Sequence, residues 1–402
     1  MDFNIEKYID AIYSNLEEEN IHNTDYRNTL VIGDMHFGIK SNSLVWLNKQ
    51  LEFFRLQVIP IILNAKKLNI DNVVFLGDLF DVRYSTNTFI GCEVKNLFRE
   101  INRACESSDI SCYVVAGNHD FYSLSEEFIK YNVYELIFGQ EFIRENYRLH
   151  FITEEPTVIY KFSKNITCAK IGELIEPYIL GKLQLLPWYQ AENKEHLKNT
   201  LQNILKEQNH DKVKAIYAHW DLENNCDHET HQFLKHNDIS VYSGHIHYIW
   251  KDENYKLYNV GACCQFTFGD ANQDRYIYII NEDKNKQIAI KNVITPKFII
   301  LYNDDIFNDD IINTFNDNTY VEIRILSKYK DTAKYKERIK YIKSTYIGTS
   351  IKLSIISDDN IFENNNNTNI IQSNVEQYIE QNTPKELKSN LDIIVDKIKD
   401  KN

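Results

Sequence analysis

Carboxylate, imidazole and amide side chains occur together in five short motifs within the first 250 residues. These residue types suit hard or borderline divalent cations such as Mn²⁺, Mg²⁺, Fe²⁺ or Zn²⁺, and no cysteine takes part, which argues against a structural zinc site. Two cations about 3.5–4 Å apart, sharing one bridging carboxylate, would clamp a phosphate for in-line attack by hydroxide. The motifs read G-D-M-H, G-D-L-F-D, G-N-H-D, A-H-W and G-H-I-H, and their polar residues are Asp34, His36, Asp78, Asp81, Asn118, His119, Asp120, His219, His245 and His247.

Each motif comes directly after an apolar run of strand length, and helix-period stretches lie between the runs. Such alternation predicts an α/β domain with a largely buried central sheet. The carboxyl ends of strands in an open α/β sheet meet at one crevice, so we expect the five motifs to converge there. A glycine or alanine precedes each motif's first polar residue, which permits a sharp turn and close backbone approach. The strands are predicted at 29–32, 73–76, 112–116, 215–218 and 240–243, and the helices near 44–68, 89–105, 125–138 and 195–207.

Each motif taken alone also has an ordinary structural explanation. A single G-D-x-H is often a loop without function, an isolated strand histidine is usually a satisfied core or surface residue, and Asn118 alone would be a turn residue. The ordered occurrence of all five motifs favours a shared site. His219 has competitors nearby in the sequence, namely His210, His228 and His231. It is preferred because it ends an apolar strand, whereas the other three lie in polar loops.

The rest of the chain is predicted to form several further parts. Residues 1–28 are a polar, acidic N-terminal extension with one amphipathic stretch from Ile5 to Leu16 that predicts a short helix. Residues 246–293 alternate around hairpin-like turns, which predicts a second, antiparallel sheet on the same 29–293 domain. Strands at 297–302, 320–326 and 350–356 with a helix near 331–344 predict a small α+β domain at 297–357. A linker rich in asparagine at 358–369 precedes two short helices at 370–402.

Composition and charge argue against several classes of protein. The 402 residues include 45 basic and 58 acidic side chains, and the resulting formal net charge of −13 argues against a protein that coats nucleic acid through bulk positive charge. The first 20 residues contain acidic side chains where a signal peptide would be basic, and no apolar run approaches about 18 residues, so we expect neither secretion nor membrane spanning. Seven cysteines without a C-x-x-C pair favour free thiols in a reducing, cytoplasmic compartment.

Taken together, the motifs resemble the calcineurin-like metallophosphoesterase family, whose pattern D-x-H, G-D-x-x-D, G-N-H-D/E, H and G-H-x-H is complete here over residues 29–293. The resemblance implies a sandwich of two mixed sheets flanked by helices. His119, oriented by Asp120, would act at the leaving-group oxygen as general acid or transition-state stabiliser, and Asp81 would support the ligands from behind. The implied ligands are Asp34, His36, Asp78 and His247 for one metal and Asp78, Asn118, His219 and His245 for the other.

Three further stretches resemble the nuclease subunit of the double-strand-break repair nuclease–ATPase complex, in its SbcD-type and tailed-phage recombination branch. They are 77–83 (G-D-L-F-D-V-R), 185–188 (L-L-P-W), and 259–261 with 268–270 (N-V-G and F-G-D). This resemblance implies a Mn²⁺-dependent DNA exonuclease and endonuclease for break processing, recombination or replication, with 297–357 as a capping domain that presents DNA. Two features depart from the family pattern. An extension of 28 residues precedes the first motif, and Asp81 stands where cellular relatives tend to have histidine.

Two other functions would use the same motifs. A phosphatase or cyclic-nucleotide phosphodiesterase would share the metals, but it needs neither the extra α+β domain nor a helical tail. A non-catalytic scaffold, similar to the inactive phosphoesterase subunits of some polymerases, predicts lost ligands, and none is lost. Lys40 and Arg83 follow the first two motifs and are candidate contacts to DNA phosphates, although solvated loop charges explain them equally well. With few phosphate contacts, much of the DNA affinity would come from a partner.

The segment 370–402 has two apolar stripes on helices too short to be stable alone. Thr383 and Pro384 supply an N-cap and a first helical residue for the second helix. Isolated helices of this length are marginal in water, so the stripes must pack on their own chain, a second copy or another protein. By resemblance, the tail would bind the coiled-coil base of an ABC-type, SMC-like ATPase, and we expect the chain to form a homodimer. The stripes consist of Ile371, Val375 and Tyr378, followed by Leu387, Leu391, Ile394 and Ile398.

Overall fold

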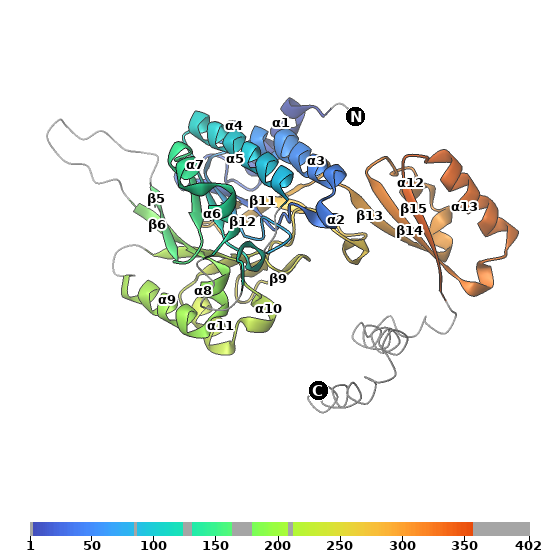
Figure 1. Ribbon diagram of the computed structural model, residues 1–402. Helices are drawn as coiled ribbons and strands as arrows, with labels where there is room; N and C mark the ends of the chain where they lie inside the picture. The colour runs from blue at the N-terminus through green and yellow to red at the C-terminus, as the bar shows by residue number, and fades with distance from the viewer. Residues whose placement is uncertain (1–2, 84–86, 124–130, 163–178, 208–211, 357–402) are drawn as a thin grey trace, which may run out of the picture. The chain divides into compact units, whose positions relative to one another are not determined.

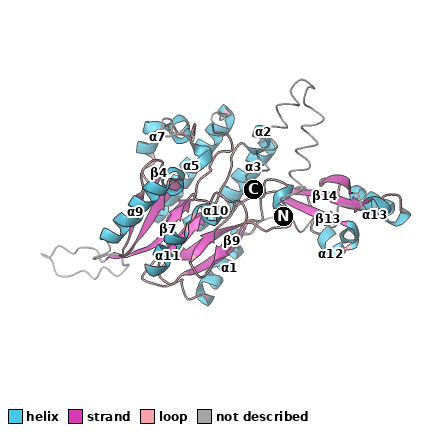
Figure 2. Ribbon diagram, turned by 90° about the horizontal axis from the view of Figure 1, so that it is seen from below, coloured by secondary structure: helices cyan, strands magenta, loops and turns pink. Residues whose placement is uncertain are grey.

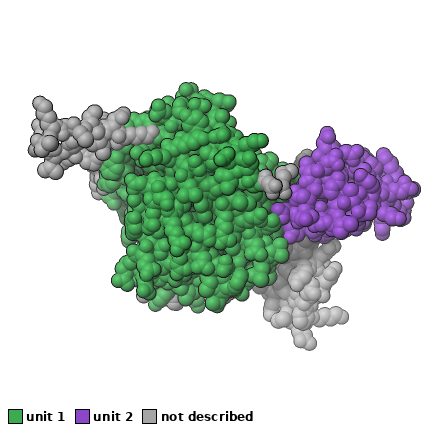
Figure 3. Space-filling view, turned by 90° about the horizontal axis from the view of Figure 1, so that it is seen from above, with its two compact units in different colours: residues 1–298 green, residues 299–402 purple. Residues whose placement is uncertain are grey.

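The computed structural model describes residues 3–83, 87–123, 131–162, 179–207 and 212–356. The chain divides into two compact units, one of residues 1–298 and one of residues 299–402 (Figure 3). The predicted linker and both predicted tail helices, with their apolar stripes, lie outside the described residues. None of the described helices combines the length and the apolar character that crossing a membrane requires.

The first unit contains two six-stranded mixed sheets (Figure 1). One has the order β12-β11-β1-β2-β3-β4, with β1 at Asn28–Ile32, β2 at Ile70–Phe75, β3 at Ser111–Val115, β4 at Leu149–Ile152, β11 at Tyr276–Asn281 and β12 at Lys286–Lys291. The other has the order β5-β6-β7-β8-β10-β9, with β5 at Thr157–Phe162, β6 at Ile179–Leu186, β7 at Val213–Ala218, β8 at Ser240–Ser243, β9 at Trp250–Asp252 and β10 at Leu257–Asn259. The predicted α/β sandwich of two mixed sheets is confirmed.

Successive side chains along the central strands alternate between two cores, which explains why these strands are apolar throughout. In β1, Leu30 and Ile32 pack among the helices on the first sheet, whereas Val31 packs between the sheets with Tyr217 of β7. Figure 2 shows the strands of this unit between helices. The helices on the first sheet are α1 (Ile5–Glu18), α3 (Leu44–Phe53), α4 (Ile59–Leu63), α5 (Thr88–Ser108), α6 (Val133–Ile137) and α7 (Gly139–Glu145), and those on the second are α8 (Trp188–Glu192), α9 (Lys194–Glu207), α10 (Leu222–Asn225) and α11 (His228–His236).

The hairpins at residues 246–293 do not form a sheet of their own, so that prediction is wrong. The hairpin of β9 and β10 extends the second sheet because β10 pairs in parallel with β8. The hairpin of β11 and β12 extends the first sheet because β11 pairs antiparallel with β1. Both hairpins place apolar side chains in cores that already exist, such as Leu257 in the second and Ile279 in the first. Extending an existing sheet buries these side chains without adding the unpaired edge strands that a separate sheet would have.

The helix predicted in the N-terminal extension is present and belongs to the first unit. The Asn4 side chain caps it by accepting a hydrogen bond from the Lys7 amide at 3.0 Å. Ile9, Ile12 and Leu16 form its buried stripe and pack in the same core as β1. Helix α1 therefore covers part of the outer face of the first sheet.

A buried polar cluster joins the two sheets at the amino end of β1. The Lys161 side chain is 1% exposed and donates to Thr29 Oγ1 at 3.0 Å, and it forms an ion pair with Asp71. Glu282 is also buried and accepts a hydrogen bond from the Tyr217 hydroxyl at 2.7 Å. Burial raises the pKa of Glu282, and the Lys161 ammonium opposes that rise. The lysine therefore compensates two carboxylates between the sheets.

Replacing this lysine is expected to destabilise the first unit. Lys161→Met should lower the free energy of unfolding by about 3 kcal/mol because Asp71 and Glu282 would lose their cation in a buried position. The matched control is Lys214→Met, which breaks a partly exposed pair with Asp283 and should cost at most about 1 kcal/mol. Urea unfolding followed by circular dichroism measures both, and equal midpoints for the two variants would contradict the expectation.

The second unit has a three-stranded sheet in the order β13-β14-β15, with β14 and β15 parallel. Its core includes Leu301, Val321, Ile323 and Ile342. The strands and the longer helix lie within two residues of the positions predicted from the sequence, and β13 begins just before the boundary between the units. The elements are β13 (Lys297–Tyr302), α12 (Asp309–Ile312), β14 (Thr319–Leu326), α13 (Ala333–Thr345) and β15 (Ser350–Ile356).

Candidate metal centre

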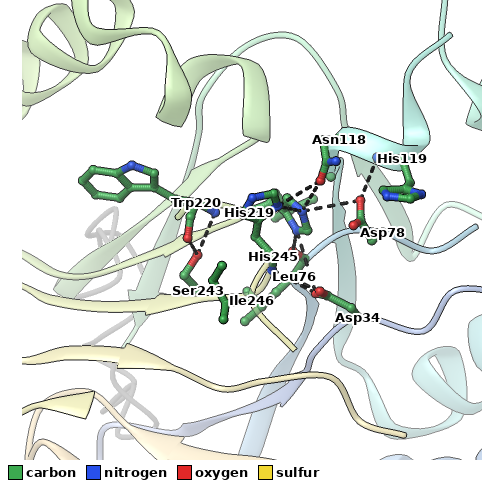
Figure 4. A network of polar contacts seen from close by, with 12 residues as sticks. Asp34, Leu76, Asp78, Asn118, His119, His219, Trp220, Ser243, His245 and Ile246 are labelled. Carbon is green, nitrogen blue, oxygen red and sulfur yellow. Dashed lines mark hydrogen bonds and ion pairs between the residues drawn. The ribbon is translucent and has the colours of Figure 1, made fainter. Parts of the chain in front are cut away.

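The five motif loops meet at one end of the sandwich, after β1, β2, β3, β7 and β8 (Figure 4). Hydrogen bonds to main-chain carbonyl oxygens fasten neighbouring loops to each other. The amides of Met35 and His36 both donate to the Asp78 carbonyl oxygen, at 3.2 and 2.9 Å. Ser243 Oγ, at the end of β8, donates to the Ala218 carbonyl oxygen of β7 at 3.1 Å. The strand ends thus hold together side chains that are up to 213 residues apart in the sequence, from Asp34 to His247.

Three motif residues have a left-handed backbone that non-glycine residues rarely adopt. The φ angles are 49° at His36, 47° at Asp78 and 81° at His245. A residue in this region costs about 1–3 kcal/mol, and such strain gathers at functional sites where the surrounding structure holds it in place. Here the hydrogen bonds between the loops hold it. His36, Asp78 and His245 are all among the side chains that the motif loops bring together.

The motif glycines allow the loops to approach closely. A Cβ atom on Gly77, whose φ is 106°, would overlap the His219 ring, and one on Gly117 would overlap the Asp78 carboxylate. Alanine at either position would therefore displace a motif side chain. This is the close backbone approach that the sequence predicts.

Site A consists of Asp34, His36, Asp78 and His247. The Nε2 atoms of His36 and His247 are 3.0 Å apart. His36 Nε2 lies 3.6 Å from Asp78 Oδ2, and His247 Nε2 lies 3.9 Å from Asp34 Oδ2. Ligand atoms about 2.1 Å from a common cation lie roughly 3.0–3.4 Å from one another. Small side-chain adjustments would bring all four onto one ion.

Site B consists of Asp78, Asn118, His219 and His245. Asn118 Oδ1 lies 3.0 Å from both His219 Nε2 and His245 Nδ1, and these two nitrogens are 3.2 Å apart. Asp78 Oδ1 lies 3.4 Å from His219 Nε2. Figure 4 shows the Asn118, His219 and His245 side chains turned toward one another beside Asp78. Because Asp78 presents one oxygen to each site, it is placed to bridge two cations.

The chemistry of these donors fits divalent cations. Burial lowers the pKa of His36 to about 3 and that of His245 to about 4, so both imidazoles are neutral at pH 7 and have a free lone pair. Burial raises the pKa of Asp34 to about 7. Burial alone would lower the pKa of His219, but Asp78 raises it to about 9. In the metal-free protein a proton therefore lies where a cation at site B would bind.

Neighbouring groups fix which nitrogen each histidine offers. His219 Nδ1 lies 2.7 Å from the Leu76 carbonyl oxygen, which leaves Nε2 directed at Asp78. His36 Nδ1 lies 3.5 Å from Asp81 Oδ1, which leaves its Nε2 for site A. Such partners orient ligands and raise their basicity. Asp81 therefore lies beside the His36 nitrogen that is not used at site A.

The structure corrects the predicted partner of His119. The Asp120 carboxylate is fully buried and accepts hydrogen bonds from the Leu79 and Gly117 amides at 3.1 and 2.9 Å and from the Tyr134 hydroxyl at 2.7 Å, not from the His119 ring. His119 Nδ1 instead lies 2.6 Å from the main-chain carbonyl oxygen of Asp81. A buried carboxylate needs several hydrogen-bond donors. The Asp120 carboxylate therefore joins the loop after β2 to the loop after β3 and does not bind the His119 ring. Ligand atoms of His119, His36 and Asp78 lie within 4.8 Å of one another.

Both predicted phosphate contacts lie near this centre. Lys40 is in a left-handed turn at Ile39–Asn42 (α2), and its ammonium lies 5.5 Å from the centre of the Phe298 ring. Burial raises the pKa of Asp81, and Lys40 is close enough to oppose that rise. Arg83 Nη2 faces the end of the Asn118 amide that points away from site B.

Two supporting residues were missed in the sequence. Arg275 is 3% exposed and donates to the His247 carbonyl oxygen at 2.8 Å and to Asp270 Oδ1 at 2.7 Å. Tyr134 donates to Asp120, as described above. Neither residue stands in a motif, and Arg275 follows a polar stretch that reads as an ordinary loop. The role of Arg275 becomes visible only in the folded chain, where its loop lies next to His247 of site A.

Loss of the Arg275 brace is expected to weaken metal binding at site A. Arg275→Gln removes the donor that fixes the main chain at His247, and the affinity for one of two Mn²⁺ ions should fall about 10–100-fold. Arg55→Gln, which breaks an exposed pair with Glu100, is the control. Isothermal titration with Mn²⁺ measures both, and unchanged affinity in Arg275→Gln would contradict the positioning role.

Comparison with known proteins agrees with this geometry. The family model for calcineurin-like phosphoesterases matches residues 27–248, more than half of the 402-residue chain and the part that contains all five motifs. No curated protein sequence matches the chain. One solved structure aligns over 66% of this chain and 99% of its own chain, with 10% sequence identity and a TM-score of 0.34, a likeness too weak to bear on fold or substrate. The chain belongs to the calcineurin-like phosphoesterase family and is a metal-dependent phosphoester hydrolase.

Proposed function

We propose that the chain is a Mn²⁺-dependent DNA exonuclease and endonuclease that acts in DNA break processing, recombination or replication. The observation that carries the proposal is the complete donor set of sites A and B in a chain that continues into a separate α+β unit. Hydrolysis of a small phosphate ester needs no such unit, whereas a nuclease can use one to present DNA. The likeness of residues 77–83, 185–188, and 259–261 with 268–270 to repair-nuclease subunits supports the same substrate.

The residues of this chain would have the following roles in phosphodiester hydrolysis. Two divalent cations bound at sites A and B would supply a hydroxide and neutralise charge on the phosphate. His119, whose Nδ1 is held by the Asp81 carbonyl, would donate a proton from Nε2 to the leaving oxygen. Lys40 and Arg83 would contact non-bridging oxygens of the same or a flanking phosphate. Their charges would compensate locally for the acidic chain.

Mn²⁺ is proposed as the physiological cation, with Mg²⁺ as the alternative. Nitrogen-rich donor sets favour Mn²⁺ over Mg²⁺, which prefers oxygen ligands and retains its water. Metal that binds only the folded protein stabilises it, by about 2.7 kcal/mol at 100 times the dissociation constant. We therefore expect Mn²⁺ to raise the melting temperature more than equal concentrations of Mg²⁺. A flat response across a wide Mn²⁺ range would count against the metal centre.

A comparison of substrates tests the nuclease proposal against a phosphatase or cyclic-nucleotide phosphodiesterase. Purified protein with Mn²⁺ is offered linear duplex DNA, a cyclic nucleotide and p-nitrophenyl phosphate, with chelator and His119→Ala as controls. Cleavage of DNA that both controls abolish supports the nuclease. Hydrolysis of the small esters together with intact DNA would establish the alternative.

We also propose that residues 370–402 bind the coiled-coil base of an ABC-type ATPase and that the nuclease acts as a homodimer. The support is the pair of apolar stripes in the sequence, since this segment lies outside the described residues. Deleting 370–402 should abolish co-purification with the ATPase and leave Mn²⁺-dependent cleavage intact. Undiminished complex formation would overturn the docking proposal, and sedimentation of the full-length chain tests the dimer.

A further inference from the structure

The side-chain amide of Asn118 lies between Arg83 and the site B ligands, and each side requires the amide oxygen. In one orientation its oxygen is 3.0 Å from the site B nitrogens of His219 and His245, and its NH₂ group faces Arg83 Nη2. In the other orientation the oxygen is 2.9 Å from Arg83 Nη2, and the NH₂ group lies 3.0 Å from both His219 Nε2 and His245 Nδ1 and 3.3 Å from Asp78 Oδ2. The amide cannot offer its oxygen to both ends at once.

Hydrogen bonding favours the second orientation in the metal-free protein. The amide oxygen then accepts from a charged guanidinium, and the NH₂ group faces two imidazole nitrogens and a carboxylate oxygen. His219 Nε2 has Asp78 Oδ1 as a further neighbour, 3.4 Å away. In the first orientation, an amide donor would face a guanidinium donor at hydrogen-bond distance, which is repulsive.

A cation at site B reverses the preference. An amide nitrogen has no lone pair to give to a metal, so Asn118 can serve as a ligand only through its oxygen. The NH₂ group must then turn toward Arg83, and the guanidinium must move away. Arg83 is half-buried at the end of the G-D-L-F-D-V-R stretch, so its guanidinium is not enclosed by the core.

We propose that a divalent cation bound at site B turns the Asn118 amide and thereby releases Arg83, which becomes free to bind a substrate phosphate only in the metal-loaded protein. The inference deepens the proposed function, on which it rests for the identity of the phosphate ligand. Arg83 is thus a substrate-binding residue whose availability depends on the metal. The metal-free protein would bind phosphate weakly, since its Arg83 is already occupied.

Removing Arg83 is expected to tighten Mn²⁺ binding. In the wild type, a cation must break the hydrogen bond between Arg83 and Asn118, whereas in Arg83→Met there is no such bond to break. One of the two Mn²⁺ dissociation constants should therefore fall about 10-fold in Arg83→Met, the size expected for a charged hydrogen bond. At the same time, the dissociation constant for orthophosphate in the Mn²⁺-loaded protein should rise about 10-fold.

Two controls separate the amide exchange from the loss of one positive charge. Lys40→Met removes a charge near the same centre without touching Asn118, and it should change the Mn²⁺ dissociation constants less than about 2-fold. Asn118→Asp supplies two equivalent oxygens, one for the metal and one for Arg83. Adding Arg83→Met to Asn118→Asp should therefore not tighten Mn²⁺ binding.

Isothermal titration of the full-length variants with Mn²⁺, and then with orthophosphate, distinguishes the outcomes. Tighter Mn²⁺ binding in Arg83→Met alone, repeated in Arg83→Ala, supports the exchange. Unchanged Mn²⁺ affinity, an equal gain in Lys40→Met, or a gain that persists in the Asn118→Asp background would overturn it. These titrations use no DNA, so failure of the nuclease proposal would appear separately, in the cleavage assay.

Discussion

Asp78→Ala is expected to lose both divalent cations and essentially all hydrolytic activity. Asp78 Oδ2 lies 3.6 Å from the His36 ligand atom of site A, and Asp78 Oδ1 lies 3.4 Å from the His219 ligand atom of site B. Each ion supplies several kcal/mol of charge stabilisation in the transition state, so losing both should slow phosphodiester hydrolysis by at least about 10⁴-fold. Metal content by mass spectrometry and the initial rate of cleavage measure the two effects.

Two further variants show that bridging, not general damage, causes the loss. Asp78→Asn keeps the side-chain shape and tolerates the left-handed backbone at this position, but it has only one oxygen. It should retain at most one cation per chain. Asp109→Asn, which breaks a surface pair with Arg148, should retain two. Two cations per chain in Asp78→Ala would refute the bridging role.

The positions of the metal-site residues could be predicted because an apolar run that ends in polar residues marks the end of a strand. Apolar runs such as 73–76 and 215–218 ended where polar residues began, and the structure places β2 and β7 there. Convergence was expected from the strand ends of one open sheet, whereas the structure divides the five strands, with β1, β2 and β3 in the first sheet and β7 and β8 in the second. The ligand types then indicated the chemistry before any distance was known.

Features that depend on tertiary contacts could not be predicted in the same way. His119 is held by the Asp81 main-chain carbonyl, which any residue at that position would present, so no side-chain pattern indicates it. Arg275 acts through a loop return and two hydrogen bonds. The single helix predicted over 44–68 instead contains a π-helical turn at Phe54–Val58, just before Pro60, which has no N–H for a regular helical bond. Local apolar periodicity does not resolve such a change.

His119→Ala is expected to keep both cations but to lose most of the activity on DNA. The main-chain amide of residue 119 donates to Asp78 Oδ1 at 2.8 Å, and this bond does not need the imidazole, so the bridging carboxylate stays in place. General acid catalysis by a positioned histidine contributes about 10²–10⁴-fold, and kcat for DNA cleavage should fall by that factor. The Mn²⁺ content should remain at the wild-type value.

The leaving group provides the sharpest test of this role. An alkoxide leaving from DNA needs a proton, whereas p-nitrophenolate leaves readily without one. His119→Ala should therefore slow hydrolysis of bis(p-nitrophenyl) phosphate at least about 10-fold less than it slows hydrolysis of DNA, because only the alkoxide depends on a Brønsted acid. The control is His150→Ala. His150 lies on β4 and is not among the candidate metal ligands, so this variant should change the hydrolysis rate of neither substrate. An equal loss on both substrates would show that His119 acts by stabilising charge on the phosphate, not by protonating the leaving oxygen.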